Sequence, residues 1–183
     1  MFYVVKKAYM ANYKLGFDLR FYKSYQGFSG SRSGAAIFKP ENKTSERFSK
    51  LSSVVFHESD LVSQITLVFN DSAASEFAAV KARVFKDSNL IEFDVTVGPL
   101  AKAQHGKEVI VVFWAPSINN KGEFFTDSNG LQMEARRVNY RPTWHYTPAS
   151  HQNISVNYYP VTSAIAVRDN ATAHQMTVMT TRT

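Results

Sequence analysis

The tetrapeptide Asp-Ser-Asn-Gly at residues 127–130 constrains the fold of this chain more than any other short feature. Asn129-Gly130 is a dipeptide that accepts two successive positive φ values, as a type I′ hairpin turn requires. The segments on each side, residues 122–126 and 131–135, contain apolar residues at positions suited to strands. The sequence therefore predicts a β-hairpin within an all-β domain.

Apolar and polar residues alternate in several other segments, which is the pattern of strands that bury one face. The alternation is regular in residues 15–22, 80–85 and 91–97, and further strands are expected at residues 163–167 and 176–180. A continuous β-branched run at residues 107–114 predicts a strand that is buried on both faces. Turn-forming or polar connections separate these strands at residues 27–34, 86–89, 117–121 and 168–174.

Residues 76–85 allow two interpretations. Residues 71–76 resemble a helix start and good helix formers follow, whereas the alternation from Val80 onward favours a strand. We adopt the strand. The sum is about ten strands with hairpin connections, which predicts an all-β fold, a large antiparallel β-sandwich, with residues 1–183 forming a single domain.

The composition excludes several classes of protein. With 183 residues, 44% of them apolar and 20% charged, the chain is long enough for one domain with a core and is not disordered. No apolar run approaches the roughly 20 residues of a membrane-spanning helix, so we expect no membrane span. The N-terminus does not have the pattern of a signal peptide. The absence of cysteine excludes disulfides and cysteine metal sites.

The net charge of +6 raises the question of nucleic-acid binding. The basic residues are scattered, and only Lys6-Lys7 and Arg136-Arg137 form pairs. No basic run alternates with aromatic residues along one strand face, as a nucleic-acid surface would require. We therefore expect a mildly basic surface and no nucleic-acid partner.

Longer motifs occur in a fixed order along the chain. G-E-F-F-T-D-S-N-G at residues 122–130 is followed by Arg136-Arg137, by Y-R-P-T-W at residues 140–144 and by N-Y-Y-P-V at residues 157–161. These motifs resemble the C-terminal β-region of family 38 glycoside hydrolases, the retaining α-mannosidases, and in particular the lysosomal branch. Shorter matches are S-G-A-A-I-F-K-P at residues 33–40, V-G-P at 97–99, G-K-E-V at 106–109 and Q-M-T-V-M-T at 175–180.

The resemblance implies a galactose-mutarotase-like supersandwich that is incomplete in these residues. In this family the aspartate nucleophile, the acid/base aspartate and the zinc ligands lie in an N-terminal catalytic α/β domain, which is absent from this chain. The implied function is that of a non-catalytic β-sandwich that packs on the catalytic domain and completes its pocket. The whole enzyme would hydrolyse terminal α-linked mannose from glycans in a lysosome or vacuole, or after secretion, with zinc as a cofactor outside this chain.

The resemblance also assigns Ser33, Gly34 and the position of Ala36 to substrate binding. The family motif S-G-A-Y places a tyrosine near the bound mannose, and this chain has Ala36 there. Alanine cannot donate a phenolic hydrogen bond, and the loss of one buried polar contact costs about 1–3 kcal/mol. A neighbouring tyrosine such as Tyr25 is the alternative donor.

The residues themselves supply little catalytic machinery. Glu92 and Asp94 lie about 7 Å apart by strand rise, wider than the roughly 5–5.5 Å of a retaining carboxyl pair, and are expected on a solvated face. Asp127 is expected to bind backbone amides of its turn. The five histidines show no metal-ligand spacing, and no nucleophile elbow is present. We therefore expect no catalytic residue and no metal site in this chain.

Four asparagines lie in Asn-x-Ser/Thr sequences and are candidate glycan acceptors: Asn42, Asn70, Asn153 and Asn170. For the aromatic residues Trp144, His145, Tyr146, Tyr158 and Tyr159, packing is favoured over direct stacking on a sugar ring. Two other functions stay open, a stand-alone carbohydrate-binding sandwich and a purely structural interaction domain.

Overall fold

A computed structural model of the chain describes residues 2–8, 11–26, 33, 37–71, 75–100, 106–145, 147 and 154–181. Twelve strands and one short 3₁₀ helix, Ser155–Asn157, occur in these residues. The strands are β1 (Phe2–Ala8), β2 (Ala11–Lys23), β3 (Glu46–Arg47), β4 (Leu51–Glu58), β5 (Val62–Asp71), β6 (Glu76–Phe85), β7 (Ile91–Val97), β8 (Lys107–Trp114), β9 (Glu123–Ser128), β10 (Gln132–Arg137), β11 (Ala164–Arg168) and β12 (Gln175–Met179).

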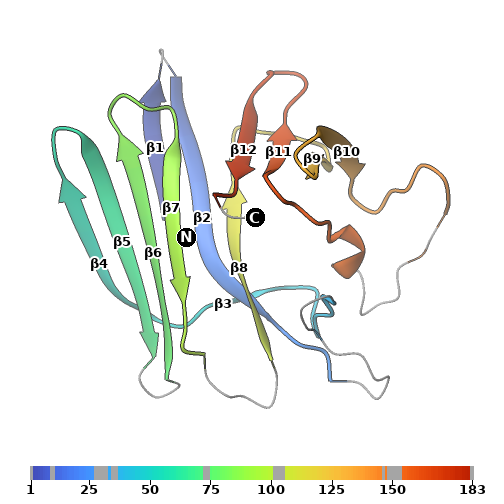
Figure 1. Cartoon of the computed structure of the whole chain (residues 1–183), viewed down its shortest axis with the longest axis horizontal. Helices are drawn as coiled ribbons and strands as arrows, with labels where there is room; N and C mark the ends of the chain where they lie inside the picture. The colour runs from blue at the N-terminus through green and yellow to red at the C-terminus, as the bar shows by residue number, and fades with distance from the viewer. Residues whose placement is uncertain are drawn as a thin grey trace.

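These strands form three four-stranded sheets, each antiparallel throughout. The β5 sheet has the order β4-β5-β6-β7, and the β9 sheet has the order β10-β9-β11-β12. In the β2 sheet, the long strand β2 pairs with β1, β3 and β8. The β5 sheet forms one layer and the β2 sheet lies beside it. The β9 sheet lies on the opposite side of the β2 sheet from the β5 sheet (Figure 1). The predicted all-β antiparallel sandwich is confirmed.

The core lies between the β5 sheet and the β2 sheet. Its buried side chains are Phe17, Leu19, Phe21, Phe48, Leu67, Phe69, Ala78 and Val80. On each strand these residues are two positions apart, because successive side chains point to opposite faces of a sheet. Edge-to-face contacts of Phe93 with Phe17 and Phe113, each with ring centroids 5.0 Å apart, join β7 to the two strands of the facing layer.

The structure tests two of the strand predictions. Residues 76–85 form β6, so the strand interpretation is confirmed, with Ala78, Val80 and Ala82 buried. The prediction that residues 107–114 are buried on both faces is wrong. This segment is β8, in which every residue is half-buried, with Val109, Val111 and Phe113 packed against the core.

An ion pair crosses between the two core layers. Lys107 at the start of β8 donates to the carboxylate of Glu76 at the start of β6, and both side chains are largely buried. The Lys107 ammonium also lies 4.7 Å from the centroid of the Phe21 ring. The pair therefore holds the first residues of β6 and β8 close to each other. Its formation removes both charges from water, which costs free energy.

Candidate functional site

The turn at residues 127–130 forms as the sequence predicts. Asn129 and Gly130 have φ values of 50° and 72°. The Leu131 N–H donates to the Ser128 carbonyl at 3.0 Å and closes the turn. The turn joins β9 to β10, which pair in antiparallel register from Glu123 to Arg137. The predicted hairpin is confirmed.

The carboxylate of Asp127 fastens this hairpin to the start of β11. It accepts hydrogen bonds from the hydroxyl of Thr162 and from the backbone N–H groups of Gly130 (2.9 Å), Thr162 (2.9 Å), Ser163 (3.1 Å) and Ala164 (3.3 Å). The Thr162 hydroxyl, followed by the backbone donors, holds the pKa of Asp127 well below its ordinary value. The prediction that Asp127 binds backbone amides is confirmed, and this carboxylate is a structural anion.

Asp169 has the same role at the other end of β11. Its carboxylate accepts from the backbone N–H groups of Ala171 (2.8 Å), Thr172 (3.3 Å) and Asn119 (3.3 Å). The Ala171 and Asn119 donors lower the pKa of Asp169. Asp169 thereby connects the turn between β11 and β12 to the segment that precedes β9.

The N-Y-Y-P segment is fastened to the loop that follows β10. Asn139 and Asn157 exchange two hydrogen bonds of 2.9 Å, one from the Asn139 backbone N–H and one from the Asn157 side-chain amide. The Arg141 guanidinium donates to the carbonyl oxygen of Val156. Each of these contacts joins a residue of one motif to the residue next to the other motif, so Y-R-P-T-W and N-Y-Y-P-V lie side by side, although residues 145–156 separate them in the sequence.

The two tyrosines of this segment have different environments. The Tyr159 ring packs edge-to-face against Phe124, with centroids 5.5 Å apart. The guanidinium carbons of Arg136 and Arg141 lie 4.8 and 5.1 Å from the centroid of the same ring. Tyr158, in contrast, is 62% exposed. The expected packing role holds for Tyr159, whereas most of Tyr158 is open to solvent.

The structure also brings part of the S-G-A-A-I-F-K-P motif to this region. Ser33 accepts a hydrogen bond from the Lys39 N–H at 2.8 Å, and its own N–H donates to the Ser24 hydroxyl at 3.1 Å. The ring of Phe38 lies 5.4 Å from that of Tyr158. Ser33 therefore connects Ser24 with Lys39, and the adjacent Phe38 contacts the N-Y-Y-P segment. Gly34 and Ala36 lie outside the described residues, so their assignment to substrate binding stays a prediction.

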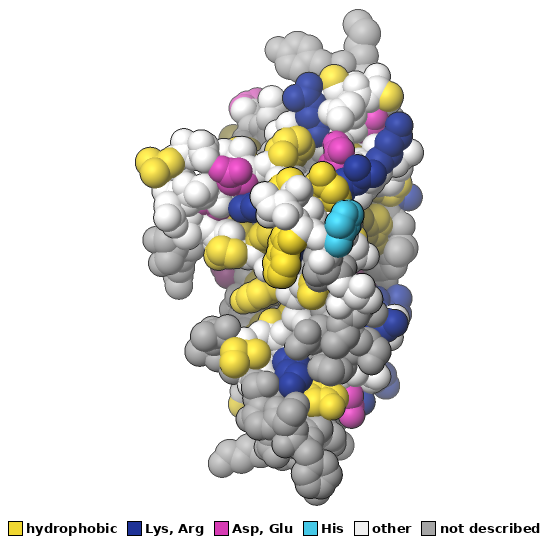
Figure 2. Space-filling model, turned by 90° about the vertical axis from the view of Figure 1, so that its right-hand side faces the viewer, with side chains coloured by type: hydrophobic (Ala, Val, Ile, Leu, Met, Phe, Trp, Pro, Cys, Tyr) yellow, Lys and Arg dark blue, Asp and Glu magenta, His cyan; other side chains and the backbone are white. Residues whose placement is uncertain are grey.

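Apolar side chains gather on the face that carries the β9 sheet and the following loops, with Lys and Arg side chains around them (Figure 2). Among the described residues between 131 and 158, six large hydrophobic residues are exposed: Leu131, Met133, Val138, Tyr140, Trp144 and Tyr158. An exposed apolar area of this kind is typical of a surface that contacts another protein segment or a ligand.

The remaining carboxylate candidates do not form a catalytic pair. Glu92 and Asp94 are exposed on β7, as predicted, with Glu92 3.3 Å from Arg83 and Asp94 opposite Lys81 in the register of β6 and β7. Among the residues that the structure describes, no group of three or more His, Asp or Glu side chains could hold a metal ion. Within the same residues, no helix has the length and apolarity to cross a membrane.

Three of the four candidate glycan acceptors are described by the structure. Asn42, Asn70 and Asn170 are all exposed, and Asn170 lies in the turn between β11 and β12. Asn153 lies outside the described residues. Exposure is what glycan attachment requires of the folded protein.

Sequence reasoning missed the contacts that hold this region together. The pairing of Asn139 with Asn157 and that of Ser24 with Ser33 have no local sequence pattern, because each joins segments brought together only by the fold. The ordered family motifs were the available signal, since they mark most of the segments that meet here.

The fold by itself defines an all-β domain, and comparison with known families identifies the class of protein. The family described as "Glycosyl hydrolases family 38 C-terminal domain" matches residues 4–183. The chain belongs to this family.

Several similar proteins are α-mannosidases by name. The lysosomal alpha-mannosidase of Mus musculus is 36% identical over 155 residues, covering 84% of this chain and 14% of the relative. That of Homo sapiens is 33% identical over the same coverage. The alpha-mannosidase of Canavalia ensiformis is 30% identical over 170 residues, covering 87% of this chain and 16% of the relative. The chain thus spans about one seventh of the length of these relatives.

Proposed function

We propose that this chain is the non-catalytic β-sandwich part of a retaining α-mannosidase that hydrolyses terminal α-linked mannose from glycans. In this role it packs on an N-terminal catalytic α/β domain and completes the substrate pocket of that domain. The observation that carries the proposal is the family match over residues 4–183, together with relatives that are named α-mannosidases.

The geometry of the carboxylates supports a non-catalytic role. Asp127 and Asp169 are held by backbone amides, and Glu76 is paired with Lys107. A retaining glycosidase needs one carboxylate that is free to attack the sugar and a second carboxyl group that transfers a proton. Groups engaged in this way are poorly suited to either task, so we assign the chemistry to the catalytic domain.

The face formed by the β9 sheet and the loops after β10 is the surface that we assign to the pocket. It combines the exposed rings of Trp144 and Tyr158 with Ser33, which accepts a hydrogen bond from the Lys39 N–H. Aromatic rings with one polar end suit a contact that is partly apolar and partly wet. Zinc belongs to the catalytic domain in this proposal, and the lysosome or vacuole is the proposed location because several relatives are named lysosomal.

Hydrolysis of a chromogenic α-mannoside tests the proposal. We expect no turnover by the purified chain, with or without added zinc. We expect turnover by a family 38 catalytic domain that lacks its own C-terminal region to rise when the chain is added. Turnover by the chain alone, or a catalytic domain whose rate is unchanged at saturating chain, would contradict the proposal.

The second candidate function is a carbohydrate-binding module without catalysis. The observation in its favour is the 62% exposure of both Trp144 and Tyr158, since exposed rings can stack on the C–H face of a pyranose. Calorimetry with mannose separates the two functions. Saturable binding to the chain, without any effect on a catalytic domain, would favour the module.

A further inference from the structure

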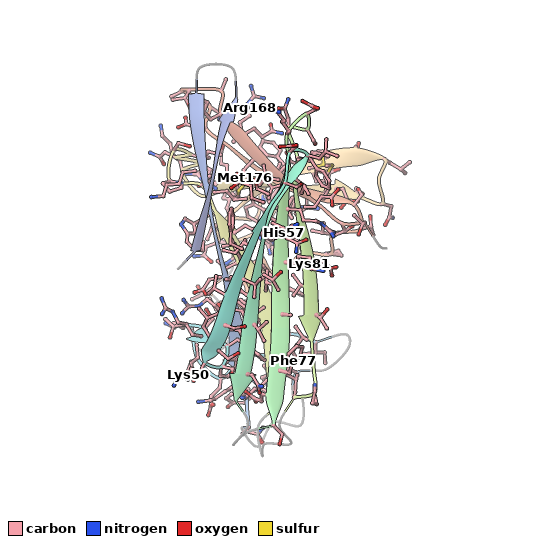
Figure 3. The ribbon with its side chains drawn as sticks, turned by 90° about the vertical axis from the view of Figure 1, so that its left-hand side faces the viewer. Lys50, His57, Phe77, Lys81, Arg168 and Met176 are labelled. Carbon is pink, nitrogen blue, oxygen red and sulfur yellow. The ribbon has the colours of Figure 1, made fainter. Side chains whose placement is uncertain are left out.

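Strand β4 forms an outer edge of the β5 sheet and has no strand on its far side among the described residues. It lies at the margin of the sandwich and is nearest the viewer in Figure 3, where Lys50 and His57 mark its two ends. Its seven residues from Ser52 to Glu58 are all exposed. Three of them are consecutive large apolar residues, Val54 (52% exposed), Val55 (56%) and Phe56 (63%).

The hydrogen bonds of neighbouring residues show which backbone groups of β4 point outward. The Ser59 N–H donates to Val62 at 3.0 Å, and the Asn70 N–H donates to Lys50 at 3.1 Å. In an antiparallel ladder, every second residue of a strand is hydrogen-bonded to the neighbouring strand. Counting back from Ser59, the residues of β4 that are bonded to β5 are therefore His57 and Val55. The N–H and C=O groups of Val54, Phe56 and Glu58 consequently point away from the sheet.

The apolar side chains of this edge are also left uncovered by the facing layer. Val54 lies opposite Leu67 and Phe56 lies opposite Ile65 on β5. Leu67 is fully buried and Ile65 packs on the core, so Val54 and Phe56 are on the core-facing side of the sheet. Their exposure shows that β4 projects beyond the β2 sheet.

Natural proteins protect such edges with Lys, Pro or inward-pointing charges. Residues 51–58 contain no Lys, Arg or Pro, and one irregularity in pairing occurs between Leu51 and Ser53. The other outer strand of the same sheet, β7, carries Glu92 and Asp94. Strand β4 therefore has the properties of a strand that pairs with another strand.

We propose that two copies of this chain pair edge to edge through β4, in antiparallel register about a two-fold axis at Val55. In this register Val54 of one copy lies opposite Phe56 of the other, and both residues carry the outward-pointing backbone groups that the ladder needs. The two side chains lie on the same, core-facing side of the joined sheet, so each covers the other. The inference is independent of the proposed function.

The charges at the ends of β4 suit this register. Glu58 and Asp60 at the end of one strand lie beside Lys50 at the beginning of the other, and residues 52–57 place no like charges opposite each other. The paired segment is short, so we expect it to bury less surface than the roughly 1,200–2,000 Å² of stable interfaces. The dimer is therefore expected to dissociate on dilution.

Light scattering and a cysteine cross-link test the proposal. The mass of the purified chain is expected to rise with concentration from 20.6 kDa to twice this value. In the proposed register Val55 faces its own copy in a non-bonded pair, with Cα atoms about 4.5 Å apart, which a disulfide can bridge. Because the chain has no cysteine, V55C should form a disulfide-linked dimer under mild oxidation.

The matched control is S53C, on the same face of the same strand. Ser53 lies opposite His57 of the other copy, so two Cys side chains at position 53 would be about 13 Å apart and should not join. A chain that is monomeric at every concentration would overturn the proposal, and so would equal cross-linking of V55C and S53C. Slow amide exchange at Val54 and Phe56 in a monomer would also overturn it, since another part of the chain would then cover β4.

Discussion

At the scale of single residues, a buried carboxylate organises the segment that carries the family motifs. Asp127 is 6% exposed and binds donors from both its own turn and the start of β11. The turn sequence explains the first set of bonds, since Asp before Asn-Gly commonly accepts from the turn backbone. The second set depends on the path of residues 162–164.

Replacing Asp127 tests this role. D127A should lower the melting temperature by roughly 5–10 °C, because several backbone N–H groups lose their acceptor. D127N, which keeps the shape and one acceptor oxygen, should lose less. Thermal unfolding followed by circular dichroism measures both. The control is D94N on the exposed face of β7, and an equal loss in D94N and D127A would contradict the anchoring role.

At the scale of elements, the two core layers are joined by packing of large aromatic residues and by the ion pair of Glu76 with Lys107. The pair lies where β6 and β8 begin, at corresponding ends of the facing sheets. Because the Glu76 side chain is only 4% exposed, its charge depends on Lys107 for compensation.

Removing one partner of this pair should therefore be costly. K107M leaves the Glu76 carboxylate buried without its ion-pair partner, and we expect a loss of about 3 kcal/mol in the free energy of unfolding. The double variant E76M/K107M should recover much of that loss. Urea unfolding measures all three proteins. R83M, which breaks the more exposed pair with Glu92, should cost less than about 1 kcal/mol. Additive losses from E76M and K107M would show that the pair is not coupled.

At the scale of the whole molecule, the two anchored aspartates make stability depend on pH. Their pKa values are lowered in the folded chain from the ordinary value of 3.8. A carboxylate with a lowered pKa binds fewer protons when folded than when unfolded at the same pH. Its contribution is therefore complete well above pH 3.8 and is lost as the pH falls below that value.

We expect the urea midpoint of the chain to start to fall below about pH 5 and to fall most steeply below about pH 4. The variant D127N/D169N should start from a lower midpoint at neutral pH and show a shallower fall in acid. Chemical unfolding at a series of pH values measures both slopes. Parallel curves for the two proteins would mean that other carboxylates determine the acid sensitivity.

Much of the fold could be predicted from the sequence because strand periodicity is a local signal. The alternation in residues 15–22 and 80–85 identified core residues such as Phe17, Leu19 and Val80, and Asn129-Gly130 identified the hairpin turn. The β-branched run at residues 107–114 misled, because its composition cannot show that every residue of β8 stays partly exposed at the edge of its sheet.

The sequence by itself determined the fold class, the β9–β10 hairpin and, through ordered motifs, the family. Each of these depends on residues that are close together in the chain or on motifs recognisable one by one. Only the tertiary structure decided that Tyr159 is packed and Tyr158 exposed, that Asp127 binds residues 162–164, and that β4 projects beyond the β2 sheet. These features depend on which distant segments meet, and no local pattern of side chains specifies that.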